Sequence, residues 1–269
     1  MNPSTETMNQ QTMTEPGIEA AAQHLNQLRL SARPGPRLAL PLRPLSNEDA
    51  WRIQRRVGQS RGQTVRGWKC SVPNKGQWTV AAIYELHEDA AQVLAPANAQ
   101  GMARIEPEFG YLLGQDLPPR DEPYLPPEID RAVGAVHCAI EVLGCRYAQP
   151  EQASPLEHMA DSHQHQCLVL GQRINQAPTH PDFELGLELD GTAPRSHHAR
   201  HTQGDARLPL YWLAEFLRQQ GVGLRAGQVV ITGSLAGALL LPVGAKAVLR
   251  YADLGAVSLS AQALHTSAA

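Results

Sequence analysis

The chain has 269 residues and carries 23 lysines and arginines against 26 aspartates and glutamates, a net charge of −3. This length allows one large domain, or a domain with a helical extension, and a substantial buried core. The small net charge gives no support for a nucleic-acid or anionic-membrane partner. The four cysteines form no C-x-x-C pair and no regular framework, which favours a reducing compartment over a disulfide scaffold.

We expect neither a secretory signal nor a membrane span. Residues 1–17 lack both a basic start and an apolar run, and their polar composition predicts a disordered tail. The most apolar stretch, residues 229–248, is interrupted by glycines, a proline and a lysine, which argues against a membrane helix. The expected location is therefore the cytoplasm.

Helical spacing predicts two helices near the amino terminus. Apolar positions recur at this spacing over residues 18–30, and the proline-rich segment that follows ends the helix. Ser46 can cap a second helix, with Asp49 three residues further on. Residues 65–70 and 78–84 are short and turn-bounded, which predicts strands or extended loops.

The rest of the chain mixes short helices with strands. The pattern predicts short helices over residues 86–94 and 127–136, and strands over residues 103–113 and through Glu141. The further expected elements are strands over residues 167–170, 183–189, 228–232, 245–251 and 257–259, and a helix from Pro209 to a left-handed cap at Gly221. Interspersed strands with few connecting helices predict an α+β fold rather than a doubly wound sheet.

Three glutamates form the main candidate site. Glu106 and Glu108 are two residues apart, so on a strand they share one face. Glu141 lies in an apolar run, where it needs a counter-charge or a proton. Mg²⁺ or Mn²⁺, which prefer oxygen ligands, would neutralise all three. The alternative is a solvated strand face, with Glu141 paired to an arginine such as Arg146.

Two other segments can contact an anionic substrate. Lys69 lies in a strand-like segment and can supply a positive charge, or transfer a proton if burial lowers its pKa. Small residues follow the apolar run at residues 229–231, where backbone N–H groups and the hydroxyls of Thr232 and Ser234 can approach an anion. A surface lysine and a simple turn are the alternatives.

Histidines cluster over residues 158–165 and 197–201, which raises the question of a zinc site. Neither H-E-x-x-H nor a Cys/His framework is present, so solvated loops are the preferred interpretation. His137 lies in an apolar run and is expected to be a hydrogen-bonded core or site-wall histidine. The absence of G-x-S-x-G and G-x-G-x-x-G removes the usual support for serine hydrolases and Rossmann folds.

Together, these segments resemble the 2-keto-4-pentenoate hydratase and 2-oxo-hepta-3-enedioate hydratase group of the fumarylacetoacetate hydrolase superfamily. The likeness covers about residues 48–260, and its carriers are residues 50–54, 67–69, 104–108, 139–142 with Arg146, 160–162 and 224–235. The resemblance implies a mixed β-roll with a smaller N-terminal helical region. We therefore expect a helical or α+β region over residues 18–100 and a β-roll catalytic domain over residues 101–265.

The resemblance also implies roles for individual residues. Glu106, Glu108 and Glu141 would bind Mg²⁺ or Mn²⁺, and Lys69 would be the catalytic lysine. The implied substrate site comprises Asp161, Ser162, His163, Thr232, Gly233, Ser234 and Leu235. Small residues usual in this family are replaced by residues 163–166, whose histidines would either add an acid/base pair or occlude the site. Segments usual after Lys69 are also missing, which leaves the substrate's tail open.

The implied activity is hydration of a 2-hydroxy-2,4-dienoate to a 4-hydroxy-2-oxo acid, with the cation stabilising an enolate. A decarboxylase of the 4-oxalocrotonate type and an acylpyruvate C–C hydrolase are alternatives, because they need the same electron sink. A catalytically silent partner subunit is the alternative of another class. The expected partners are a small 2-oxo or 2-hydroxydienoic acid, further copies of the chain in a homo-oligomer, and an enzyme of the same pathway.

Overall fold

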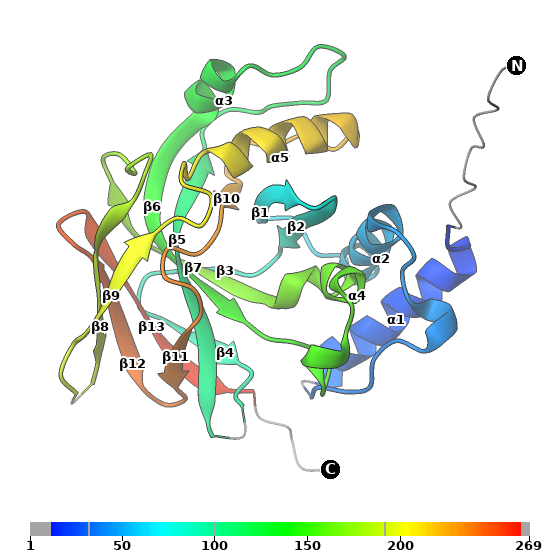
Figure 1. Cartoon of the computed structure of the whole chain (residues 1–269), viewed down its shortest axis with the longest axis horizontal. Helices are drawn as coiled ribbons and strands as arrows, with labels where there is room; N and C mark the ends of the chain where they lie inside the picture. The colour runs from blue at the N-terminus through cyan, green and yellow to red at the C-terminus, as the bar shows by residue number, and fades with distance from the viewer. Residues whose placement is uncertain (1–11, 32, 99, 191, 265–269) are drawn as a thin grey trace, which may run out of the picture.

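The computed structural model describes residues 12–31, 33–98, 100–190 and 192–264, which form two sheets and a group of helices (Figure 1). The larger sheet has eight strands in the order β2 (Gln77–Ile83), β1 (Gly67–Asn74), β10 (Val229–Ile231), β5 (Met102–Leu113), β6 (Val133–Leu143), β7 (His165–Ile174) and β3 (Leu86–Glu88), with β11 (Leu239–Pro242) also paired to β5. The smaller sheet has five strands in the order β4 (Ala91–Ala95), β13 (Gly255–Ala263), β12 (Lys246–Tyr251), β8 (Asp182–Leu189) and β9 (Arg195–Arg200).

Both sheets mix parallel with antiparallel pairing. β1 pairs in parallel with β10, β3 with β7 and β4 with β13, whereas the other neighbours are antiparallel. In Figure 1 the two sheets curl around a common interior, with β8, β9 and β12 on the left. The predicted α+β class with a mixed β-roll is confirmed.

Aromatic side chains join the two sheets. The ring of Phe109, on β5, lies 5.9 Å from that of Tyr251 on β12 and 6.4 Å from that of Phe183 on β8. Phe109 and Tyr251 are both almost completely buried. Because the three side chains come from opposite sheets, this cluster is the core that fixes how the sheets pack.

The predicted amino-terminal helices are both present. α1 (Glu15–Ser31) and α2 (Asn47–Ser60) lie with α4 (Pro155–Ala160) on the right in Figure 1, beside β1 and β2. The Ser46 side chain accepts a hydrogen bond from the Asp49 N–H, as the capping pattern predicted. The buried Gln54 amide of α2 donates to the carbonyls of Val80 and Met159, at 3.0 and 2.9 Å. This side chain therefore ties α2 to both β2 and α4.

Part of the expected tail is ordered. α1 begins at Glu15, and the buried Met13 donates its N–H to the Asp49 carboxylate at 3.0 Å. The prediction of a disordered tail is therefore wrong for residues 12–17, because Met13 and α1 pack against α2. Residues 1–11 lie outside the described residues.

Local spacing misassigned two segments. Residues 86–94 form β3 and β4 rather than a helix, because each strand pairs in parallel with a distant one. The helix expected over residues 127–136 ends at Ala132 as α3 (Pro126–Ala132), and β6 begins at Val133. Two valines in this segment favour a strand, since β-branched side chains fit a pleated surface. Two further strands, β9 and β11, were not predicted.

The last predicted helix is confirmed as α5 (Leu208–Gln219), followed by Gly221 with a φ of 65°. None of the helices in the described part of the chain is both long and apolar enough to cross a membrane. Short 3₁₀ turns occur at Leu40–Leu42, Pro150–Gln152 and Ser162–Gln164. All four cysteines are free: Cys70, Cys138 and Cys167 are buried, and Cys145 is half-buried.

Candidate metal centre

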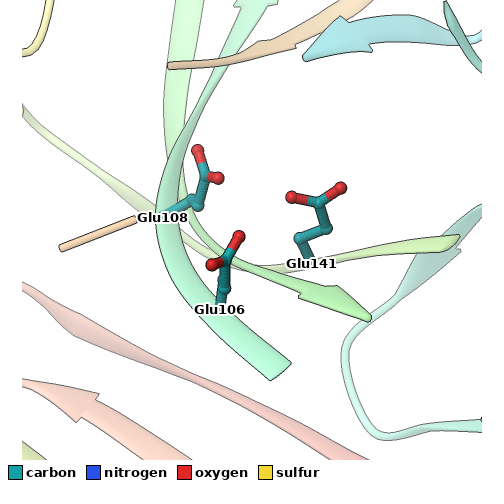
Figure 2. Close-up of side chains that lie close together, drawn as sticks. All are labelled: Glu106, Glu108 and Glu141. Carbon is teal, nitrogen blue, oxygen red and sulfur yellow. The ribbon is translucent and has the colours of Figure 1, made fainter. Parts of the chain in front are cut away.

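Three glutamates converge on one face of the β5–β6 pair. Glu106 lies directly opposite Glu141 in the antiparallel register, and Glu108 follows on the same face of β5. One oxygen from each carboxylate lies within 4.8 Å of the other two. Figure 2 shows the three carboxylates pointing toward a shared space. The structure thus brings together the three residues that the sequence singled out.

The trio fits a divalent cation. Glu108 and Glu141 are 2% and 0% exposed, and Glu106 is half-buried. Burial raises the pKa of Glu106, and burial together with the nearby carboxylates raises the pKa of Glu108 well above its usual value. Like charges held this close repel each other, and a cation with oxygen ligands such as Mg²⁺ or Mn²⁺ would relieve the repulsion.

Lys69 reaches the trio from β1. Its Nζ donates to both oxygens of Glu141, at 2.7 and 2.9 Å, and to the carbonyl of His163 at 3.4 Å. Burial alone would lower the pKa of Lys69, but the carboxylates of Glu141 and Glu106 outweigh it and raise the pKa. This direction is the opposite of the lowered pKa considered from the sequence. The ammonium group is therefore a hydrogen-bond donor at the site.

The position of Lys69 depends on the close approach of the β1 backbone to that of β10. In the parallel pairing of β1 with β10, Gly67 lies opposite Val229 and Lys69 opposite Ile231. A Cβ atom at Gly67 would lie 2.1 Å from the Val229 carbonyl oxygen. Only glycine allows this approach, so the glycine two residues before the lysine is required for the strand pairing that carries it.

One carboxylate oxygen of Glu141 can still bind a cation. Its Oε1 accepts from both Lys69 and His165, whereas its Oε2 accepts from Lys69 alone. A carboxylate oxygen has two lone pairs, so Oε2 keeps one for another partner. Burial would raise the pKa of Glu141, but Lys69 and the His165 hydrogen bond hold this pKa well below its usual value. These two donors therefore favour the charged form of Glu141.

His165 is the histidine that contacts the trio. Its Nδ1 lies 2.7 Å from Glu141 Oε1, so Nδ1 carries the proton in this hydrogen bond, and its buried Nε2 has no partner among the described residues. Burial lowers the pKa of His165 against the opposing effect of Glu141, which favours the neutral ring. A neutral ring with Nδ1 protonated leaves Nε2 as an acceptor. The sequence placed this histidine among replaced family positions, with an added acid/base group or occlusion of the site as the two alternatives.

His163 serves the site mainly through its backbone. Its carbonyl accepts from Lys69, and burial with the nearby lysine lowers the pKa of its ring to about 3. Ser162, His163 and Gln164 have φ values of 56°, 48° and 64°. Three consecutive left-handed residues are a sparsely populated backbone conformation, and such conformations cluster at binding and catalytic sites.

Asp161 has a different place from the one expected. Its buried carboxylate accepts from Arg29 at 3.3 Å, from Arg146 Nε at 3.2 Å and from the Arg146 N–H at 3.1 Å. These two arginines take up its oxygens and hold Asp161 in the chain before β7, and its role in substrate binding stays a prediction. The alternative pairing of Arg146 with Glu141 is wrong, since Arg146 bonds to Asp161.

The loop after β10 positions a trio carboxylate. The Gly233 N–H donates to Glu108 Oε2 at 2.7 Å, and Gly233 has a φ of 126°, which favours glycine. The Leu235 N–H donates to a β5 carbonyl at 2.8 Å, and the Ser234 hydroxyl to the Gly237 carbonyl at 2.9 Å. Thr232 is buried, and its carbonyl accepts from His201. Gly233 is thus the member of this loop that contacts the trio.

Tyr251 links both ligand strands to the opposite sheet. Its hydroxyl accepts from the Glu108 N–H at 3.1 Å and donates to the Ala139 carbonyl at 2.6 Å. Glu108 and Ala139 are paired across β5 and β6, so one buried hydroxyl spans the pair that carries the trio. This contact could not be predicted from the sequence, because Tyr251 lies in an ordinary strand pattern.

The other histidines of the described residues form no metal site. Within the described ranges, the glutamate trio is the one group of three or more metal-ligating side chains that come together. His137 bonds through Nδ1 to the Gly171 carbonyl at 2.9 Å, as expected for a hydrogen-bonded histidine. His197 and His198 lie on β9, and His198 contacts the exposed Asp182.

Comparisons with known proteins agree with the geometry. No protein-family model matches the chain. It is 28% identical to a 4-oxalocrotonate decarboxylase from a Pseudomonas species over 157 residues, which span 58% of this chain and 60% of that relative. It is also 28% identical to a 2-keto-4-pentenoate hydratase from Paraburkholderia xenovorans (strain LB400) over 240 residues, 83% of this chain and 87% of that relative.

The predicted resemblance is confirmed. The fold is similar to that of 4-oxalocrotonate decarboxylase from Pseudomonas putida G7, solved with magnesium and adipate, with a TM-score of 0.74. At 20% identity this likeness covers 93% of this chain and 99% of that one, and it establishes the β-roll fold. Because the sequence relatives are a decarboxylase and a hydratase, they support the prediction of an enzyme and leave its reaction to be proposed.

Proposed function

We propose that this chain is a divalent-metal-dependent lyase that adds water to a small 2-hydroxy-2,4-dienoic acid and yields a 4-hydroxy-2-oxo acid. The observation that carries the proposal is the convergence of Glu106, Glu108 and Glu141. The hydratase relative, which aligns over 83% of the chain, supports the same class of reaction.

The glutamates and Lys69 would have different roles at such a site. Glu106, Glu108 and Glu141 would hold Mg²⁺ or Mn²⁺, and the bound ion supplies a Lewis acid for a 2-oxo carboxylate group. Lys69 is buried beside the trio, where its ammonium group can bind the substrate carboxylate or give up a proton. Burial of these groups excludes water other than the reacting molecule and strengthens their electrostatic interactions.

Hydration needs one proton donor and one proton acceptor. First the 2-hydroxyl of the dienoate loses a proton while the fifth carbon gains one, and then water adds its oxygen to the fourth carbon and a proton to the third. Lys69 Nζ is the candidate donor, and the unpartnered Nε2 of His165 is the candidate acceptor. Both groups bond to Glu141, so their spacing is fixed by one buried carboxylate.

A cavity that reaches the centre only through His163, with neither Lys69 nor a trio glutamate in its lining, has room for a small substrate. Its volume is about 330 Å³, and its lining includes Trp78, Thr79, His163 and Gln164. His163 connects it to the centre, since the carbonyl of the same residue accepts from Lys69. Its size matches a small organic acid rather than a polymer.

A decarboxylase of the 4-oxalocrotonate type is the second candidate, because the similar solved structure has this activity in its name and matches along 99% of its length. An acylpyruvate C–C hydrolase and a catalytically silent partner subunit are the third and fourth candidates.

We also propose that the chain forms a cytoplasmic homo-oligomer that can associate with a pathway enzyme. Light scattering tests the oligomer, and co-purification tests the association.

Product analysis by NMR in D₂O tests the proposal. The chain is supplied with Mg²⁺ and, in turn, with 2-hydroxypenta-2,4-dienoate, 4-oxalocrotonate and an acylpyruvate, with an EDTA-treated sample as the control. We expect a hydroxyl at the fourth carbon and deuterium at the third and fifth carbons, only when metal is present. Release of CO₂ or a cleaved carbon–carbon bond would select the corresponding alternative. No turnover of any substrate would reject an enzyme of this kind.

A further inference from the structure

A second cavity lies among arginines, apart from the glutamate trio. Its volume is about 180 Å³, and it opens between the end of α1 and the segment that follows β6. Its charged lining consists of Arg29, Arg33, Arg61, Arg146 and Glu85. Neither Lys69 nor any of the three glutamates lines it, so it is distinct from the candidate metal centre.

Two of these arginines each have a buried nitrogen without a hydrogen-bond partner among the described residues. Arg146 is 5% exposed; its Nε contacts Asp161 and its Nη2 donates to the His165 carbonyl, but its Nη1 has no partner among the described residues. The Nε of Arg29 is likewise buried without a partner in this part of the chain. A buried charged donor that lacks an acceptor is costly, so an acceptor in the cavity would stabilise these groups.

The cavity also has an excess of positive charge. Four arginines line it, against one carboxylate, that of Glu85. The nearby Asp161 is already bonded to Arg29 and Arg146. Burial, together with the neighbouring Arg146, lowers the pKa of Arg29 to about 9. An anion in the cavity would offset this repulsion between arginines.

We propose that this cavity binds a small oxyanion, a carboxylate or a phosphate group, at a site of its own. Guanidinium groups present pairs of N–H donors that match two oxygens of such a group. A volume of about 15 Å³ is enough for one water molecule, so the cavity admits an anion of several heavy atoms. Leucines and prolines form most of the remaining wall, which accommodates a short carbon chain attached to the anionic group.

Isothermal titration calorimetry of the full-length chain, with inorganic phosphate and separately with malonate, tests this site. The chain is first treated with EDTA and then desalted, so that no cation at the trio holds the anion and no chelator competes for the cavity. We expect saturable binding of phosphate, malonate or both, with one site per chain. The anion that binds more tightly shows whether the cavity recognises a phosphate or a carboxylate group. The double variant Arg33→Gln/Arg61→Gln should weaken binding by about tenfold or more, because charge-assisted hydrogen bonds are lost.

Two further variants sharpen the test. Glu85→Gln removes the opposing carboxylate of the lining and should tighten binding. Arg195→Gln, on β9 and outside the cavity lining, removes an equal charge and should leave binding unchanged. The proposal is overturned if neither anion binds saturably, if Arg33→Gln/Arg61→Gln binds as tightly as the parent chain, or if Arg195→Gln weakens binding equally.

Discussion

Glu141 organises the candidate centre at the scale of single residues. It is fully buried, lies opposite Glu106, and accepts hydrogen bonds from both Lys69 and His165. Its pKa is held low by these donors, whereas the pKa of Glu108 is raised by burial and by its acidic neighbours. The charge of Glu141 is thus balanced by groups of the protein, whereas Glu106 and Glu108 still need a counter-charge.

Removing one charge of the trio tests this balance. We expect Glu106→Gln to lower activity at least about 100-fold, roughly 2.7 kcal/mol of transition-state stabilisation, because an amide is a poorer ligand for a hard cation. Steady-state kinetics across a Mg²⁺ titration measure the loss. Glu151→Gln, at an exposed glutamate, is the matched control and should keep parental activity. Parental turnover by Glu106→Gln would rule out the metal mechanism.

The sequence predicted the acidic residues of the centre better than its hydrogen bonds. The convergence of Glu106 and Glu108 follows from strand alternation, and that of Glu141 from its position in an apolar run. The partners of Asp161 and the contact of His165 with Glu141 could not be predicted, because both depend on where β7 lies beside β6. Such partners are set by tertiary packing rather than by local spacing.

At the scale of elements, the adjacent strands β5 and β6 place the whole trio. β1 adds Lys69 from across the sheet, and the loop after β10 supports Glu108. β12 contributes from the other sheet, through the hydroxyl of Tyr251 that bridges the ligand strands. The geometry of the centre therefore depends on how the two sheets pack.

Two tyrosine variants test this dependence. Tyr251→Phe removes a buried hydroxyl with two partners, and we expect a loss of about 1–3 kcal/mol in the free energy of unfolding. Tyr111→Phe is the matched control on β5, because the buried Tyr111 hydroxyl has no partner among the described residues and its removal should cost little. Urea denaturation compares the two. Equal effects would show that the Tyr251 bridge does not stabilise the fold.

Element prediction succeeded where the signal is local and failed where pairing is distant. The caps at Ser46 and Gly221 marked helix ends correctly, since capping involves residues a few positions apart. Residues 86–94 were assigned to a helix because their partners, β7 and β13, lie far along the chain. β11 escaped for the same reason, since it pairs with the distant β5. β9 is an exception, because it was missed although its partner β8 directly precedes it in the chain.

At the scale of the whole molecule, a buried carboxylate anchors the amino-terminal segment. Glu157 of α4 has no exposed side-chain surface and accepts from Arg37 Nε at 3.1 Å, with Arg43 Nε at 3.7 Å. It also closes the capping box of α4 with Ser154. Both arginines belong to the connection between α1 and α2, so this ion-pair group fastens the connection to α4.

The contribution of Glu157 should depend on pH. Burial would raise the pKa of Glu157, but the Arg37 and Ser154 hydrogen bonds outweigh it and lower the pKa. Its stabilisation is therefore complete above the unfolded pKa, near about 4.3, and is lost as the pH falls through the lower folded value. At pH 7 we expect Glu157→Gln to cost about 1–3 kcal/mol, less than a fully buried pair because the arginines are partly exposed.

Urea denaturation at pH 7, 5 and 3.5 measures this difference. The gap between Glu157→Gln and the parent chain should stay constant down to pH 5 and shrink at pH 3.5. Glu188→Gln removes one partner of an exposed pair with Arg250 and should change stability little at any pH. A gap that widens in acid would contradict the assigned direction of the pKa shift.

The four free thiols have a practical consequence. Cys145 is half-buried in the wall of the arginine-lined cavity, whereas Cys70, Cys138 and Cys167 are enclosed in strands of the larger sheet. Burial raises the pKa of Cys145 to about 11, so alkylating reagents would reach it first yet modify it slowly in neutral buffer. Without any engineered label, modification of Cys145 therefore reports on access to this cavity. Modification of the three buried cysteines reports on opening of the larger sheet.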